Sequence, residues 1–78
     1  MAYLTKDKSN LIQLWNNKPS YNFSHGIFYA WKKGKEGIDN EIAIDVSNNE
    51  KLSNLFIFLT PPRCLKLTDI DFDQIPII

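Results

Sequence analysis

His25 and Cys64 are the residues whose types could form a nucleophile–base pair, and the 78-residue chain contains one of each. Histidine activates a cysteine when the two lie within hydrogen-bond distance and a third group orients the imidazole. No orienting acid is evident, and one His with one Cys is too few for a structural zinc site. Because a phosphate-cradling glycine pattern is also missing, the sequence predicts a protein that is not an enzyme and needs no cofactor or metal.

Three carboxylates alternate with apolar residues near the end of the sequence, at Asp69, Asp71 and Asp73. In an extended strand this spacing places all three on one face. The run resembles the start of a calcium loop, but Gln74 stands where such a loop requires glycine, so a calcium site is rejected. Two interpretations stay open: a surface for a basic partner, or a charged strand edge that prevents aggregation.

A β-favouring aromatic run covers residues 25–31 and leads into a basic, glycine-containing turn at residues 32–37. We expect Phe28 and Ala30 to face the two predicted helices, leaving Tyr29 and Trp31 on the open face of the sheet. Exposed aromatic residues of this kind mark interaction sites. The alternatives are an inverted strand or an open face covered by one of the terminal segments.

Lys32 and Lys33 follow these aromatic residues directly, with Lys35 close behind. Aromatic rings beside lysines could form a stacking platform for single-stranded nucleic acid. The run does not have the fixed basic-glycine-aromatic order of sheet-type RNA-binding motifs. The alternative is a solvated hairpin turn.

The clearest element boundary lies between residues 46 and 47. Residues 41–46 alternate polar and apolar side chains, which predicts a half-buried strand. Ser47 and Glu50 then have capping-box spacing. Leu52, Leu55, Phe56 and Leu59 follow at the spacing of one helix face. These patterns predict a strand that leads directly into a helix over residues 48–59, which ends before the prolines at 61 and 62.

The remaining patterns complete an α-β-β-α-β order. Leu11, Leu14 and Trp15 indicate a first helix over residues 6–17, capped by Thr5. Residues 20–24 are expected to form a loop, and residues 64–68 a third strand. The predicted fold is α+β: a three-stranded antiparallel sheet, order 2-1-3, with two helices on one face and the aromatic strand in its centre. The apolar tail, residues 75–78, either docks on the core or adds to a partner.

Size and composition limit the function classes. A single small domain over residues 1–78 is expected, with a hydrophobic fraction of 44% typical of globular proteins. The chain lacks a membrane-length apolar run, a signal-peptide core and a second cysteine, which predicts a cytoplasmic protein that does not contact membranes. Net charge is zero, although residues 1–36 carry six lysines against two acids and residues 37–78 carry three basic against seven acidic residues. Zero net charge argues against strong nonspecific nucleic-acid binding.

The sequence therefore predicts a small non-enzymatic protein-binding module, such as an inhibitor, an immunity protein or a phage-type accessory protein. The predicted partner surface comprises Tyr29, Trp31, Lys32, Lys33, Asp69, Asp71 and Asp73. Homodimerisation through the open sheet face is a companion hypothesis. The alternative is a nucleic-acid-binding module that uses the aromatic strand and the lysine-rich turn.

Overall fold

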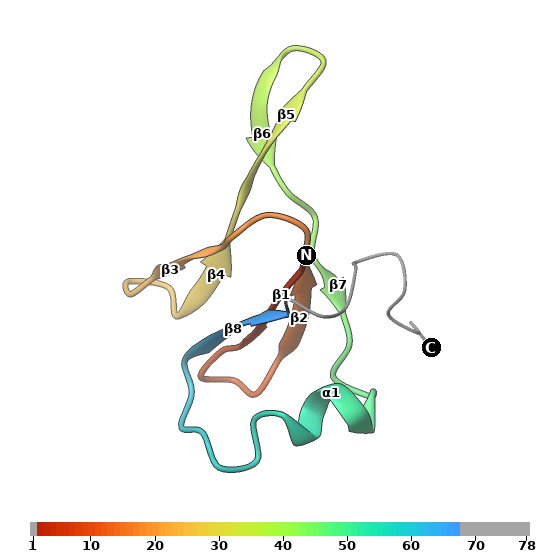
Figure 1. Ribbon diagram of the computed structural model, residues 1–78. Helices are drawn as coiled ribbons and strands as arrows, with labels where there is room; N and C mark the ends of the chain where they lie inside the picture. The colour runs from red at the N-terminus through yellow and green to blue at the C-terminus, as the bar shows by residue number, and fades with distance from the viewer. Residues whose placement is uncertain (1, 68–78) are drawn as a thin grey trace.

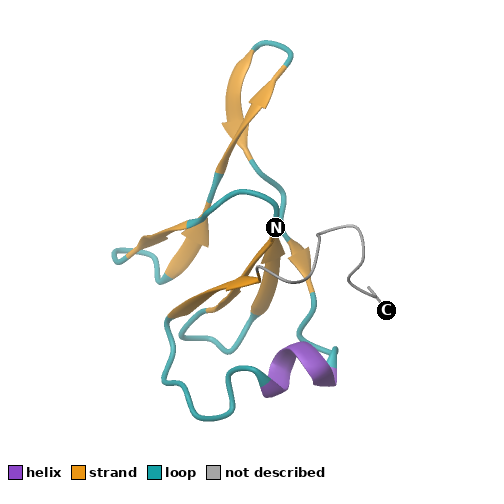
Figure 2. Ribbon diagram, viewed as in Figure 1, coloured by secondary structure: helices purple, strands orange, loops and turns teal. Residues whose placement is uncertain are grey.

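The structure is a computed structural model of the chain that describes residues 2–67. Within that range the chain forms eight strands and one short helix (Figures 1 and 2). The elements are β1 (Ala2–Lys6), β2 (Ile12–Trp15), β3 (Ser20–Asn22), β4 (Ile27–Tyr29), β5 (Trp31–Gly34), β6 (Gly37–Asn40), β7 (Ile44–Asp45), α1 (Glu50–Asn54) and β8 (Arg63–Leu67). This mainly β architecture contradicts the predicted α+β fold with two helices.

β1 and β2 pair as an antiparallel hairpin where the sequence predicted a helix over residues 6–17. The side chain of Asp7 organises the connecting loop. Its Oδ1 accepts hydrogen bonds from the Ser9 N–H (2.9 Å), the Ser9 hydroxyl (2.6 Å) and the Leu11 N–H (3.1 Å). Asn10 adopts a positive φ of 68°, which asparagine tolerates better than most residues. This local turn competes with helix formation and returns the chain beside β1.

The main sheet has four antiparallel strands in the order β7-β2-β1-β8 (Figure 1). β1 lies inside the sheet, and its Ala2 and Leu4 are fully buried. The predicted 2-1-3 order is wrong, because the aromatic residues 27–31 do not belong to this sheet. The strand predicted at 64–68 is confirmed over residues 64–67 as part of β8, but its partner is β1 instead of the aromatic strand.

One face of the main sheet holds the larger hydrophobic core. After β7 at one edge, the chain supplies Leu52 and Phe56 to this face before it forms β8 at the other edge. Burying one such side chain stabilises the fold by about 1.5–3 kcal/mol. The buried members of the cluster are Ala2, Leu4, Ile12, Leu14, Val46, Leu52 and Phe56.

The predicted strand-to-helix junction is present, but both elements are shorter than expected. The strand covers residues 44–45 instead of 41–46, and the helix 50–54 instead of 48–59. Asn49, not Ser47, caps the helix, and its side chain accepts a hydrogen bond from the Leu52 N–H at 3.2 Å. Leu52 and Phe56 are buried as the predicted apolar face requires, whereas Leu55 is exposed.

Ser47 instead ties the end of β7 to β2. Its hydroxyl accepts a hydrogen bond from the Ile12 N–H at 3.0 Å. Its own N–H donates to the Asp45 carboxylate at 2.9 Å. This backbone bond, with a second from the Ser47 hydroxyl, lowers the pKa of Asp45. Ser47 therefore connects the end of the edge strand β7 to β2 and does not cap the helix.

The opposite face of the main sheet is covered by residues from the middle of the chain. Trp15 is 3% exposed and Thr5 is 0% exposed, and the indole Nε1–H donates a hydrogen bond to Thr5 Oγ1 at 2.9 Å. Phe28 and Ala30 are buried with Trp15 in a second cluster. The prediction that these two residues face helices is therefore wrong, because they pack on a strand residue of the main sheet. The sheet is thus packed on both faces, and Thr5 is a core residue of β1 instead of a helix cap.

β3 and β4 form a separate two-stranded sheet, although residues 20–24 were predicted as a loop. Asn22 closes the turn: its Oδ1 accepts from the N–H groups of Ser24 (3.0 Å) and His25 (3.2 Å). Gly26 follows with φ at 67°, a conformation that favours glycine. Asparagine side chains that bond their own backbone in this way stabilise turns.

β5 and β6 form a third two-stranded sheet, a hairpin that projects from the body of the molecule (Figure 1). The predicted aromatic strand over 25–31 is therefore divided between β4 and β5, with Ala30 between them. The turn expected within 32–37 is present but narrower, because Lys32 and Lys33 belong to β5. Gly37, at a φ of 134°, supplies the conformation that the turn requires.

The acidic residues Asp69, Asp71 and Asp73 lie outside the described residues, as does the apolar tail 75–78. The predictions made for them stay predictions. None of the helices in the described range is long and apolar enough to cross a membrane.

Replacing Thr5 with valine tests the buried Trp15 hydrogen bond. Thr5→Val keeps the shape but leaves the indole N–H without its acceptor, so the free energy of unfolding should fall by about 1–3 kcal/mol. Thr5→Ser keeps the hydroxyl and loses one methyl group, at a cost of about 1 kcal/mol. Denaturant titrations followed by circular dichroism measure both. Equal losses in the two variants would contradict the role of the hydrogen bond.

Replacing Asp7 with alanine tests the turn that replaces the predicted helix. Asp7→Ala removes the acceptor of three hydrogen bonds and should lower the free energy of unfolding by about 1–3 kcal/mol. Asp7→Asn retains an Oδ1 acceptor and should lose less. If thermal unfolding shows the alanine variant to be as stable as the asparagine variant, the side chain does not organise the loop.

Candidate functional site

Tyr29 and Trp31 lie on the exposed side of the aromatic run, as its alternation predicted. Phe28 and Ala30 are 8% and 2% exposed, whereas Trp31 is 55% exposed and Tyr29 is half-buried. The Tyr29 and Trp31 rings have centroids 6.0 Å apart and are nearly perpendicular. This edge-to-face geometry suits the ring quadrupoles. It leaves the outer part of the indole open to solvent.

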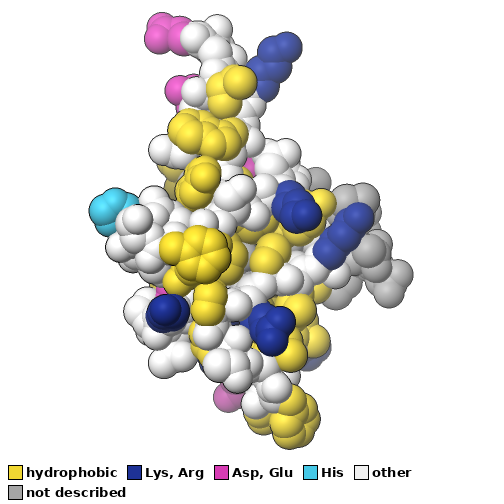
Figure 3. Space-filling model, turned by 90° about the vertical axis from the view of Figure 1, so that its left-hand side faces the viewer, with side chains coloured by type: hydrophobic (Ala, Val, Ile, Leu, Met, Phe, Trp, Pro, Cys, Tyr) yellow, Lys and Arg dark blue, Asp and Glu magenta, His cyan; other side chains and the backbone are white. Residues whose placement is uncertain are grey.

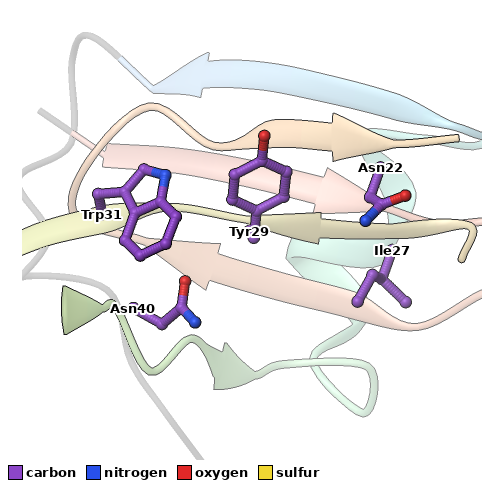
Figure 4. Close-up of a pocket in the computed structure, with 5 residues that line it drawn as sticks. All are labelled: Asn22, Ile27, Tyr29, Trp31 and Asn40. Carbon is purple, nitrogen blue, oxygen red and sulfur yellow. The ribbon is translucent and has the colours of Figure 1, made fainter. Parts of the chain in front are cut away.

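A shallow hollow of about 340 Å³ lies over these rings. Asn22 and Ile27 lie at one end, and Asn40 lies beside Trp31 (Figure 4). The hollow therefore combines an apolar floor with two side-chain amides, each able to donate and to accept hydrogen bonds. None of its lining residues in the described range is charged.

The exposed apolar surface continues onto the projecting hairpin. Asn40 lies opposite Trp31 in the register of β5 and β6, and the next pair on the same face is Lys33 with Ile38. Ile38 is 72% exposed. Hydrophobic side chains run from the hairpin down this side of the molecule (Figure 3). We call this surface the aromatic face and define it as Asn22, Ile27, Tyr29, Trp31, Ile38 and Asn40.

The two lysines predicted to border Trp31 lie on opposite faces of the β5–β6 hairpin. Lys33 shares the Trp31 face of the hairpin, but Lys32 lies on the opposite face, where its cross-strand neighbour is Asp39. Adjacent opposite charges on a strand pair offset each other locally. Of the two predicted lysines, only Lys33 therefore lies beside the aromatic face.

The aromatic face is positioned by packing beneath it. Tyr21 contacts Phe28 with ring centroids 4.9 Å apart, and both belong to the cluster around Trp15. The N–H of Glu41 donates to the carbonyl of Ala30 at 2.7 Å, which fixes the chain between β4 and β5. Alternation then directs Tyr29 and Trp31 outward.

Sequence reasoning missed both asparagines of this face. Asn40 could have been found from the hairpin register, because a turn centred on residues 35 and 36 pairs residue 31 with residue 40. Asn22 carried a turn signal, since asparagine followed closely by serine and glycine favours a tight turn. Neither residue type by itself indicates a binding site.

His25 and Cys64 do not lie on neighbouring strands, as the predicted topology required. His25 is an exposed residue of the β3–β4 turn, whereas Cys64 is on β8 of the main sheet. Desolvation raises the pKa of the Cys64 thiol, and the positive charge of Lys18 opposes this only in part. A raised pKa lowers the thiolate fraction, so the residue is a weak nucleophile. Residues 2–67 contain no group of three or more His, Cys, Asp or Glu side chains that could hold a metal ion.

Comparison of the chain with family models, curated proteins and solved structures gave no match. Within the described residues, the aromatic face joins an exposed tryptophan and a half-buried tyrosine to two side-chain amides.

Fluorescence quenching tests the exposure of Trp31 directly. Trp31 is 55% exposed and Trp15 is 3% exposed, so acrylamide should quench a readily accessible fraction of the emission in the wild-type chain. Trp31→Phe should remove that fraction and leave the protected, blue-shifted emission of Trp15. Stern–Volmer plots measure the effect. Unchanged quenching in this variant would contradict the exposed position of Trp31.

Proposed function

We propose that this chain is a non-enzymatic protein-binding module and that the aromatic face is its contact surface. The observation that carries the proposal is a tryptophan more than half exposed in an uncharged hollow with two asparagine amides. Tryptophan and tyrosine dominate the energetics of protein interfaces, and charged residues are depleted at interface centres. An inhibitor, an immunity protein or a phage-type accessory protein would act in this way.

The projecting hairpin supports a role in contact with a partner. Trp31 and Ile38 stand on β5 and β6, away from the larger core of the main sheet. A partner could therefore cover both side chains without disturbing that core. Full burial of one large side chain contributes about 1.5–3 kcal/mol, and part of this contribution remains available because Trp31 and Ile38 are 55% and 72% exposed.

Nucleic-acid binding is the second candidate, because Tyr29 and Trp31 are adjacent rings with Lys33 on the same face. Bases stack on such rings, but a lysine-lined path for the phosphates is also needed. The uncharged described lining of the hollow and the position of Asp39 opposite Lys32 in the hairpin register favour a protein partner.

Affinity capture with matched variants tests the proposal. Trp31→Ala should leave the free energy of unfolding within about 0.5 kcal/mol, as for other surface changes. It should weaken partner binding by about thirtyfold, because interface tryptophans contribute about 2 kcal/mol or more. Phe58→Ala is the matched control: Phe58 is 94% exposed and does not belong to the aromatic face.

A protein retained by the wild type and by Phe58→Ala, but lost with Trp31→Ala, supports the proposal. Retention by all three chains, or loss by both variants, contradicts it. A second copy of the chain is one partner to examine, by light scattering of the wild type and of Trp31→Ala. Tight binding of a single-stranded oligonucleotide that weakens steeply with salt would support the second candidate instead.

A further inference from the structure

A second hollow, of about 290 Å³, lies away from the aromatic face, and its lining includes Tyr3, Lys18, Cys64 and Lys66. Three parts of the chain supply these residues: β1, β8 and the loop between β2 and β3. Two of the four are lysines, and the described lining contains no carboxylate. The charged groups among its described lining residues are therefore two ammonium groups, whereas the described lining of the hollow over Trp31 is uncharged.

The register of the main sheet explains why these residues meet. Lys66 lies directly opposite Tyr3 across the β1–β8 pair, and Cys64 lies opposite Thr5. All four are on the face that carries Trp15. β8 is the edge strand on this side, so Lys66 has no further strand of the sheet beyond it within the described residues.

Lys18 reaches the hollow from a loop that is held on both sides. The Glu41 carboxylate accepts hydrogen bonds from the N–H groups of Asn16 (2.9 Å) and Asn17 (3.2 Å), just before Lys18. Pro19, just after it, is buried. The backbone at Lys18 is thus fixed before any ligand arrives, which reduces the entropy cost of binding.

The charge of Lys18 already acts on the sulfur of Cys64. It opposes the rise in the pKa of this thiol that desolvation causes. Lys18 and Cys64 line the same hollow, so the ammonium group can also act on a charged group bound there. Asp45, a carboxylate on the same face of the sheet, belongs to β7 at the opposite edge.

The geometry points to a phosphate-binding site in this hollow, with Lys18 and Lys66 as the ligands of the anion. A phosphate monoester carries a charge of about −1.5 to −2 at neutral pH, which two lysines can balance. Lysine binds phosphate as a point charge and tolerates an open site. The Tyr3 ring supplies an apolar wall for whatever group the phosphate carries.

Titration with inorganic phosphate at constant ionic strength tests the site. Saturable amide chemical-shift changes at residues 18, 64 and 66 are expected, with a dissociation constant on the order of 1–10 mM for an exposed two-lysine site. Lys18→Gln and Lys66→Gln should each weaken binding by roughly threefold or more. Lys51→Gln, at an exposed position of α1, is the matched control and should leave the affinity unchanged.

Alkylation of Cys64 by iodoacetamide, near pH 8, provides a second readout. A bound anion disfavours the thiolate and should slow the reaction with the same dissociation constant that the chemical shifts give. Lys18→Gln also raises the thiol pKa by removing a positive charge, so dissociation constants, not absolute rates, are compared between variants.

Phenyl phosphate distinguishes the two sources of the phosphate group. Tighter binding than inorganic phosphate indicates a monoester on a larger molecule that uses the Tyr3 wall, whereas equal binding indicates free phosphate. Both results support the site. Linear, unsaturable shifts, equal binding of acetate, or equal weakening by Lys51→Gln would overturn it.

Discussion

The hydrogen bond from Trp15 Nε1 to Thr5 Oγ1 joins the two inner strands of the main sheet on the face opposite α1. Both residues are almost fully buried, so an apolar residue of the same shape at position 5 would leave the indole N–H without an acceptor. A buried donor without an acceptor costs about 1–3 kcal/mol, a large share of the stability of a small domain. With the N–H satisfied, Trp15 can serve as an apolar surface on which the middle of the chain packs. Phe28 and Ala30 use that surface.

Packing on Trp15 determines which residues are left outside. Because Phe28 and Ala30 face inward, strand alternation directs Tyr29 and Trp31 to solvent. Within residues 2–67 no further layer covers the outer side of this aromatic run, where Trp31 is 55% exposed. The aromatic face is therefore the outer side of the layer that completes the second core, and its exposure follows from the burial beneath it.

The parts that the sequence predicted correctly are those determined by local alternation. The outward orientation of Trp31, the turn before Gly37 and the strand at Cys64 each depend on a few consecutive residues. The helix predicted over residues 6–17 failed because Leu11, Leu14 and Trp15 fit a helical spacing, while residues 12–15 equally fit a strand. The turn formed by Asp7 and Ser9 favours the strand. This turn depends on side-chain hydrogen bonds, which the spacing of hydrophobic residues does not reveal.

The topology failed for a different reason, since it depends on contacts between distant residues. If residues 6–17 form a helix, the aromatic run is the nearest strand beside which the third strand can lie. Because residues 2–6 and 12–15 form the β1–β2 hairpin, β8 pairs with β1 instead. The same error concealed the second hollow, which exists only because β8 brings Cys64 and Lys66 beside Tyr3. No local pattern joins Lys18 to Lys66 across that distance in sequence.

Glu41 links the two surfaces that this topology creates. Its backbone N–H bonds to the carbonyl of Ala30, between the two strands of the aromatic run. Its carboxylate accepts from Asn16 and Asn17, beside the lysine of the second hollow. Each of these bonds to a half-exposed group is modest, but together they hold two loops to one residue. The aromatic face and the basic hollow therefore share a support, although they differ in charge and in the ligands that they suit.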